Sequence, residues 1–256
     1  MTTTSDLLRQ RAQALRLHGL LAHWSEIADA PWLPPLLQWE EQEQLRRSLE
    51  RRLKDAQLGR FKALDEFNWN WPQRCDRGAV EALMTLEFLK DAASVILIGP
   101  NGVGKTMLAK NIAYQALIAG HTVMFTVAGQ LLGDLTAIDS DAALRRRLRH
   151  YAAPDFLAID EIGYLSYSNR HADLLFELLN RRYEKKSTLV TTNKPFASWP
   201  EMFPNAGCVV SLVDRLVHRS EVVAIEGESY RLKEAHERSE RNAKQRRTSK
   251  ARTLPT

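Results

Sequence analysis

Four short segments of the sequence contain side chains whose types and spacing suit the binding and cleavage of a nucleoside triphosphate. The first segment, GPNGVGKT, starts at Gly99 and follows the full pattern G-x-x-x-x-G-K-[ST]. Its glycines allow backbone N–H groups to surround phosphate oxygens without a Cβ in the way. Lys105 would place a positive charge on the β- and γ-phosphates of ATP, and the hydroxyl of Thr106 would bind Mg²⁺. The residues expected to contact the nucleotide are Gly99, Pro100, Asn101, Gly102, Val103, Gly104, Lys105, Thr106 and Met107.

Polar side chains follow two later apolar segments. The segment FLAIDE ends in Asp160 and Glu161, and STLVTT is followed by Asn193. We expect Asp160 to hold the water shell of Mg²⁺ and Glu161 to polarise the attacking water as a general base. Asn193 would orient that water or contact the γ-phosphate. The alternatives are a surface acidic pair at a strand end and an ordinary turn asparagine.

The fourth segment, LVDRLVHRS, contains two arginines four residues apart, Arg215 and Arg219, on one face of an expected helix. An arginine that reaches the γ-phosphate of a neighbouring subunit would stabilise the charge of the transition state. We expect Arg215 to have this role. The alternative is a surface helix in which the arginine pairs with Asp214 or Glu221.

Two basic regions could contact nucleic acid. The segment DAALRRRLRHYA contains Arg145, Arg146 and Arg149, which we expect to contact the phosphates of DNA without reading its sequence. From Arg231 to the end of the chain there are nine Lys or Arg and three Asp or Glu, whereas the whole chain has a net charge of +5. The basic character therefore belongs to the C-terminal tail. A solvated helix face and a solvated tail are the alternatives.

The elements that would hold these side chains alternate between apolar strands and helices. The expected strands are 94–98, 121–127, 155–160, 187–192 and 221–225, and the expected helices between them are 79–90, 105–119, 140–152, 170–185 and 211–218. Continuous apolar strands are typical of parallel sheets that are buried on both faces. The pattern predicts an α/β fold with five parallel strands between helices.

The chain divides into three regions by composition. Residues 1–66 have leucines at helical spacing and predict a small helical domain for partner or DNA contacts and self-association. Residues 67–232 form the nucleotide-binding domain, and residues 233–256 form a basic tail predicted to be disordered or loosely helical. The domain begins with the aromatic segment FNWNWPQ, whose tryptophans we expect to pack onto the sheet, with base stacking as the alternative.

Membrane and secretory classes are not expected. No apolar run approaches the ~20 residues that span a bilayer. The N-terminal segment MTTTSDLLRQRAQ has no basic region followed by an apolar one, so a secretory signal is not predicted. We expect a cytoplasmic protein.

The motifs IDEIGYL, TTNKPFASW and EGESYRL, together with the glycine-rich segment, resemble those of IstB-like transposition helper ATPases of insertion sequences. That family belongs to the AAA+ ATPases and is related to the helicase loader DnaC. The resemblance covers about residues 10 to 232. The segment PNGV stands where PPGV or PTGV is common, and the chain ends too soon after residue 232 for a full helical lid.

The resemblance implies a function that spacing alone does not. Proteins of this family bind ATP and Mg²⁺, assemble as oligomers on duplex target DNA, deform it and stimulate a DDE-type transposase. The residues to which the family's roles carry over are Lys105 and Thr106 as nucleotide and Mg²⁺ ligands, Asp160 and Glu161 as metal-site and catalytic carboxylates, Asn193 as polar sensor and Arg215 as the arginine acting in trans.

Two rival functions stay open at this point. A helicase loader would share most of these motifs and would bind single-stranded DNA. A small-molecule kinase would use the same phosphate loop but needs an acceptor pocket and an arginine-rich mobile lid. The adjacent carboxylates, Asn193 and the basic tail count against the kinase.

Overall fold

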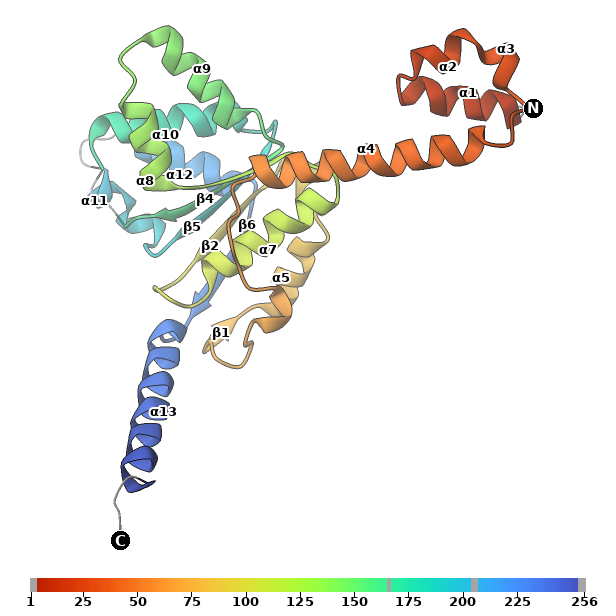
Figure 1. Cartoon of the computed structure of the whole chain (residues 1–256). Coiled ribbons are helices and arrows are strands. Elements are labelled where there is room, and N and C mark those ends of the chain that lie inside the picture. Colours follow the sequence, from red (N-terminus) through yellow and green to blue (C-terminus); the bar gives the residue numbers. More distant parts are fainter. Residues whose placement is uncertain (1–3, 165–166, 204–206, 253–256) are drawn as a thin grey trace. The chain divides into compact units, whose positions relative to one another are not determined.

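The computed structural model describes residues 4–164, 167–203 and 207–252, and the chain forms two compact units, Met1–Lys54 and Asp55–Thr256. The first unit is helical, as predicted, with α1 (Thr4–Ala14), α2 (His18–Ala22), α3 (Trp24–Ile27) and α4 (Leu33–Asp55) (Figure 1). Its small core consists of Leu8, Ala12, Leu33 and Leu37. Arg11 on α1 donates two hydrogen bonds to the carboxylate of Glu41 on α4, at 2.7 and 2.8 Å.

The second unit is built on one sheet (Figure 1). Its strands are β1 (Arg74–Cys75), β2 (Ser94–Ile98), β3 (Val123–Val127), β4 (Phe156–Ile162), β5 (Ser187–Thr192) and β6 (Ser220–Glu226), in the order β1-β6-β2-β5-β4-β3. All pairs from β6 to β3 are parallel, and β1 is antiparallel to β6. The predicted five parallel strands are confirmed. The edge strand β1 was not predicted, because two residues are too short for a recognisable pattern.

Helices cover both faces of this sheet. They are α5 (Arg77–Met84), α6 (Glu87–Lys90), α7 (Lys105–Ile118), α8 (Ala128–Thr136), α9 (Asp141–Ala152), α10 (Asn169–Arg182), α11 (Trp199–Met202) and α12 (Cys208–His218), with 3-10 turns η1 (Leu64–Glu66) and η2 (Phe196–Ser198). A last helix, α13 (Tyr230–Arg252), follows β6. The sequence did not predict α8. It begins directly after β3 without a side-chain cap, so no start signal separates the two elements.

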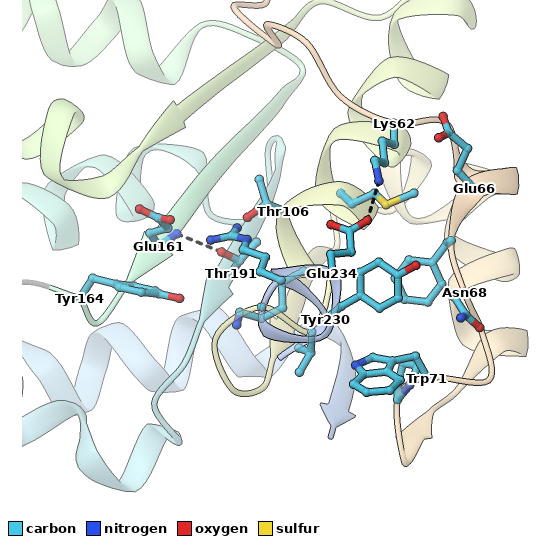
Figure 2. A pocket seen from close by; sticks show the side chains of 18 residues that line it. Lys62, Glu66, Asn68, Trp71, Thr106, Glu161, Tyr164, Thr191, Tyr230 and Glu234 are labelled. Atoms are coloured by element: carbon cyan, nitrogen blue, oxygen red, sulfur yellow. Dashed lines mark hydrogen bonds and ion pairs between the residues drawn. The ribbon is translucent and has the colours of Figure 1, made fainter. Parts of the chain in front are cut away.

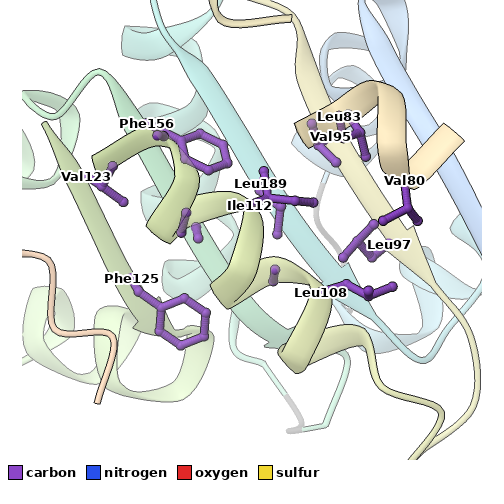
Figure 3. Packing of buried hydrophobic residues seen from close by; sticks show 14 of the residues in the cluster. Val80, Leu83, Val95, Leu97, Leu108, Ile112, Val123, Phe125, Phe156 and Leu189 are labelled. Carbon is purple, nitrogen blue, oxygen red and sulfur yellow. The ribbon is translucent and has the colours of Figure 1, made fainter. Parts of the chain in front are cut away.

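The strands bury alternate side chains in two separate cores. Val95 and Leu97 of β2 face the core formed with α5, α6 and α7, whereas Ile96 between them faces the core formed with α8 to α12. Figure 3 shows the first of these cores, where Leu108 and Ile112 of α7 lie over the sheet. Burial on both faces explains why the strands read as continuous apolar runs.

The segment after α4 belongs to the second unit, although the sequence placed the domain boundary at residue 66. Ala56 and Leu58 are buried in the core around α7. The backbone N–H of Phe125 donates to the carbonyl of Ala56 at 2.8 Å. Only two buried side chains tie this segment to the domain, and that is too few to leave a periodic pattern.

The C-terminal tail takes the helical one of its two predicted forms. The segment 233–256 is helical as far as Arg252, as part of α13, and residues 253–256 lie outside the described part. The hydroxyl of Ser229 accepts from the N–H of Leu232 at 3.3 Å and so satisfies a donor of the first turn. None of the helices in the described ranges is long and apolar enough to cross a bilayer.

Candidate nucleotide site

The phosphate loop joins the carboxyl end of β2 to the start of α7, as the motif requires. Gly102 and Gly104 have φ angles of +80° and +104°, which only glycine adopts without strain. The N-terminus of α7 points its unpaired N–H groups at the loop. The loop, its helix and the positive end of the helix dipole together form an anion site.

Lys105 is buried, with only 5% of its surface exposed. Its Nζ donates to the carbonyl oxygens of Gly99 and Pro100, both at 2.6 Å. Burial lowers the pKa of Lys105 to about 8, although the negative charge of Asp160 opposes the shift, and Arg231 adds to it. The lysine is therefore charged at neutral pH but loses its proton far more easily than an exposed lysine.

We expect ATP binding to weaken as pH rises through about 8, the pKa of Lys105. Triphosphate binds the protonated lysine, so affinity is full below that pKa and falls above it. Folding shows the opposite trend: between the folded pKa of about 8 and the ordinary value of 10.5, the unfolded chain holds more protons, so stability rises with pH. A fluorescent ATP analogue titrated from pH 7 to 9.5 measures the effect, and an affinity that stays constant over this range would contradict it.

Asp160 and Glu161 lie beside the phosphate loop at the end of β4. Thr106 donates to Oδ1 of Asp160 at 3.2 Å. A hydroxyl and a carboxylate this close are the oxygen ligands that Mg²⁺ takes from a protein when it also binds nucleotide phosphates. The two residues therefore fit a Mg²⁺ ion held together with ATP.

The backbone at Glu161 is unusual. Its φ is +64°, in the left-handed region that costs a residue with a side chain roughly 1–2 kcal/mol. The pairing of β4 with β5 shifts between Ile159 and Ile162, so the strand bulges at the two carboxylates. Conformations of this kind persist where the surroundings hold them, and they cluster at functional sites.

A cavity of about 200 Å³ lies over the phosphate loop (Figure 2). It is enclosed by residues 62–72, by the phosphate loop, by the ends of β4 and β5, and by the start of α13. The side chains that line it include Lys62, Phe67, Trp71, Met107, Tyr230 and Arg231. An apolar, aromatic wall beside a phosphate site suits a nucleobase.

Contacts between the aromatic segment and α13 close the cavity. Trp71 donates through Nε1 to the carbonyl of Glu228 at 2.9 Å, and Nζ of Lys233 lies 4.3 Å from the centre of a Trp71 ring. Lys62 pairs with Glu234 at 3.1 Å. The aromatic segment thus packs within the domain, as expected, but against α13 and the phosphate loop.

Asn193 follows β5 directly, and its Oδ1 is buried without a hydrogen-bond partner among the described residues. It lies beside Gly163, where an added Cβ would approach Oδ1 to 2.8 Å. Asn193 does not line the cavity. Tyr164, which does, donates to the Asn101 side chain of the phosphate loop at 2.5 Å.

Arg215 does not reach the nucleotide site of its own chain. Its guanidinium lies 4.8 Å from the ring centre of Phe176, and it donates to Asn180. It precedes the amino end of β6, whereas the phosphate loop follows the carboxyl end of the parallel strand β2. The side chain therefore lies near the amino ends of the parallel strands, at the side of the sheet opposite the phosphate loop.

The three arginines predicted to contact DNA are all exposed on α9. The structure gives Arg145, Arg146 and Arg149 no ion pair with any described residue. Arg147 differs, because it pairs with Asp134 at 2.5 Å and lies 5.2 Å from the ring centre of Tyr151. The charges on the exposed face are thus available to a ligand.

Sequence reasoning missed several polar residues of the site. Among them, Thr191 and Arg231 line the cavity. Arg231 lies in EGESYRL, a motif that was recognised but not assigned a role. Thr191 lies two residues before Asn193, and the strand register that brings it to the carboxylates is not visible in the sequence.

Comparison with known proteins finds relatives along most of the chain. The sequence model of a family described as "IstB-like ATP binding protein" matches residues 7–238. An ATP-binding protein named for insertion sequence IS21 of Pseudomonas aeruginosa is 42% identical over 198 residues, which cover 77% of this chain and 75% of the relative. One named for IS5376 of Geobacillus stearothermophilus is 31% identical over 249 residues, covering 94% and 99%.

A similarity to solved structures concerns the fold. The crystal structure of the DnaC helicase loader matches with a TM-score of 0.50 at 18% identity, covering 69% of this chain and 99% of that one. The predicted doubly wound nucleotide-binding fold agrees with this match.

Proposed function

Since the chain belongs to the family of IstB-like ATP-binding proteins and is an ATPase with the AAA+ fold, we propose that it assembles on duplex target DNA in its ATP-bound state and stimulates a partner DDE-type transposase. Hydrolysis then serves as a timer that resets the assembly, and ATP turnover is slow until duplex DNA is bound.

The observation that carries this proposal is the position of α13. Its first turn lines the nucleotide cavity through Tyr230, Arg231 and Glu234, and the N–H of Tyr230 donates to the carbonyl of Gly102 at 3.0 Å. The rest of this helix contains most of the basic residues of the tail. A bound nucleotide would therefore contact the first residues of α13, a helix whose later basic residues suit DNA phosphates.

We assign the chemistry of hydrolysis to five residues. Lys105 would contact the phosphates, and Thr106 with Asp160 would hold Mg²⁺, which neutralises phosphate charge when it is bound. Glu161 takes the proton of the attacking water. Asn193 helps to orient that water.

Arg215 has the trans role in this proposal. It lies toward the amino ends of the strands, away from its own phosphate loop, so in this role it would act on the nucleotide of a neighbouring copy. Such an arginine stabilises charge in the transition state and makes hydrolysis depend on assembly. The ring contacts of Arg215 with Phe176 and Tyr183 would hold its guanidinium ready.

A DNA-binding titration tests the proposal against the helicase loader. A long labelled duplex and the matching single strand are each titrated with the protein in ATP, in ADP and without nucleotide. Tight binding of the duplex in ATP alone is expected. Preference for the single strand would favour the helicase loader, and no binding of either would contradict both functions.

We expect the charge reversals Arg146→Glu and Arg149→Glu, combined, to weaken duplex binding by about 10-fold or more at 0.1 M salt. Each lost phosphate contact also lowers the slope of log affinity against log salt by about 0.9, so the slope should fall by about 2. Titrations at several salt concentrations measure both effects. The pair Lys90→Glu and Lys185→Glu makes the same change in net charge and should leave the slope unchanged; an equal loss in this control would refute a contact at α9.

A further inference from the structure

Thr191 lies opposite the bulge that contains both carboxylates. In the register of β4 and β5, Ile159 pairs with Val190 and Ile162 with Thr192, so Asp160 and Glu161 face Thr191 alone. The side chain of Thr191 is 1% exposed, and its residue lines the nucleotide cavity. One buried hydroxyl therefore serves two residues of the bulged strand.

This hydroxyl makes a hydrogen bond in each direction. It donates to Oδ1 of Asp160 at 2.5 Å. It accepts from the backbone N–H of Glu161 at 2.9 Å (Figure 2). A threonine hydroxyl has one proton and two lone pairs, so both bonds form at once. The first bond fixes the Asp160 carboxylate, and the second holds Glu161 in its left-handed conformation.

We propose that Thr191 is a positioning residue of the ATPase reaction. Thr106 and Thr191 both donate to Oδ1 of Asp160, so Oδ2 would be the oxygen available to Mg²⁺ and its waters. The bond to the N–H of Glu161 holds its backbone, and the backbone conformation sets the direction in which the side chain leaves the strand. The proposal rests on the roles assigned above to Asp160 and Glu161.

The substitution Thr191→Val removes the hydroxyl and keeps the shape of the side chain. We expect kcat for duplex-stimulated ATP hydrolysis to fall about 10- to 100-fold, as for other residues that orient metal ligands. The KM for ATP should stay within about two-fold, because the contacts of the phosphate loop remain. The Mg²⁺ concentration for half-maximal rate should rise. Thr191→Ser restores the hydroxyl and should recover most of kcat.

The variant Thr126→Val provides a matched control for Thr191→Val. Thr126 on β3 is also a buried threonine, but its hydroxyl contacts only the carbonyl of Val127, at 3.5 Å. Thr126→Val should therefore keep the kcat of the unmodified chain. Unchanged kcat in Thr191→Val, or a loss in Thr191→Ser as large as in Thr191→Val, would overturn the proposal.

The variant Glu161→Gln distinguishes an error in the role of Thr191 from an error in the role of Glu161. If Glu161→Gln is inactive and Thr191→Val is fully active, the role of Thr191 is wrong and that of Glu161 stands. If Glu161→Gln is active, the assigned general base is wrong. The Mg²⁺ dependence of Thr191→Val still decides whether Thr191 positions Asp160, and no change in it would refute that role.

Discussion

Replacing Glu161 with glutamine is expected to lower kcat for ATP hydrolysis by about 100-fold or more while ATP still binds. Glutamine has the shape of glutamate, and its backbone N–H can donate the same hydrogen bond to the Thr191 hydroxyl, so the loop geometry should persist. It lacks the negative oxygen that takes a proton from water. Single-turnover hydrolysis and equilibrium binding of ATP, measured on the same preparation, test both parts of this expectation.

Glu184 provides a matched control. It too is a glutamate in the left-handed region, with φ of +56° against +64° for Glu161, but it does not line the nucleotide cavity. Glu184→Gln should hydrolyse ATP at the rate of the unmodified chain. Normal turnover in Glu161→Gln would refute the role of Glu161 as general base. Loss of ATP binding would show that the substitution acts on the fold.

Replacing Gly99 with alanine should destabilise the nucleotide-binding domain by about 1–3 kcal/mol and abolish ATP binding. An added Cβ would lie 2.1 Å from the backbone carbonyl oxygen of Ile225 on β6. The backbone cannot withdraw easily, because the N–H of Gly99 donates to the carbonyl of Thr192 at 3.1 Å. The new methyl group must therefore separate β2 from β6 or shift the phosphate loop.

The denaturant midpoint and ATP affinity of Gly99→Ala measure these effects. Gly133 in the middle of α8 has nothing within 4 Å of an added Cβ. Gly133→Ala should leave ATP binding unchanged and raise stability by up to about 1 kcal/mol, because alanine favours helix. If Gly99→Ala binds ATP normally, the close packing of β6 against the loop is not a requirement of the site.

Much of the fold could be predicted from the sequence because the sheet is parallel and buried on both faces. The strands 94–98 and 187–192 have the bounds predicted for them. Helices that follow a loop with glycine or a polar cap, such as α7 and α9, begin at or next to their predicted residues. Of the elements missed, β1 and α11 are short, and α8 begins directly after β3 without a start signal.

The candidate site was predictable only where its residues are consecutive in sequence. The phosphate loop follows β2, and the pair Asp160 and Glu161 lies near the end of β4, so pattern and strand order place them together. The role inferred for Thr191 depends on the bulge in β4, which is a property of pairing between strands. The cavity wall joins residues 62–72 to residues 230–234, and no local pattern indicates a contact over that separation.

The ion pair of Lys62 with Glu234 and the ring contact of Lys233 with Trp71 link residues 62–71 to α13 beside the cavity. Both segments line the cavity, so a nucleotide bound there would lie between them. In the proposed function this contact is how the chain reports the bound nucleotide to its DNA-binding surfaces, and hydrolysis reverses it.

The size of the complex on DNA tests the central claim most directly. Glu161→Gln is mixed with a long duplex in ATP, in ADP and without nucleotide, and the mass of the complexes is measured by analytical ultracentrifugation. We expect large assemblies of many copies on the duplex in ATP, and at most small complexes in ADP or without nucleotide. Complexes of the same mass in all three conditions, or none on the duplex in ATP, would contradict it.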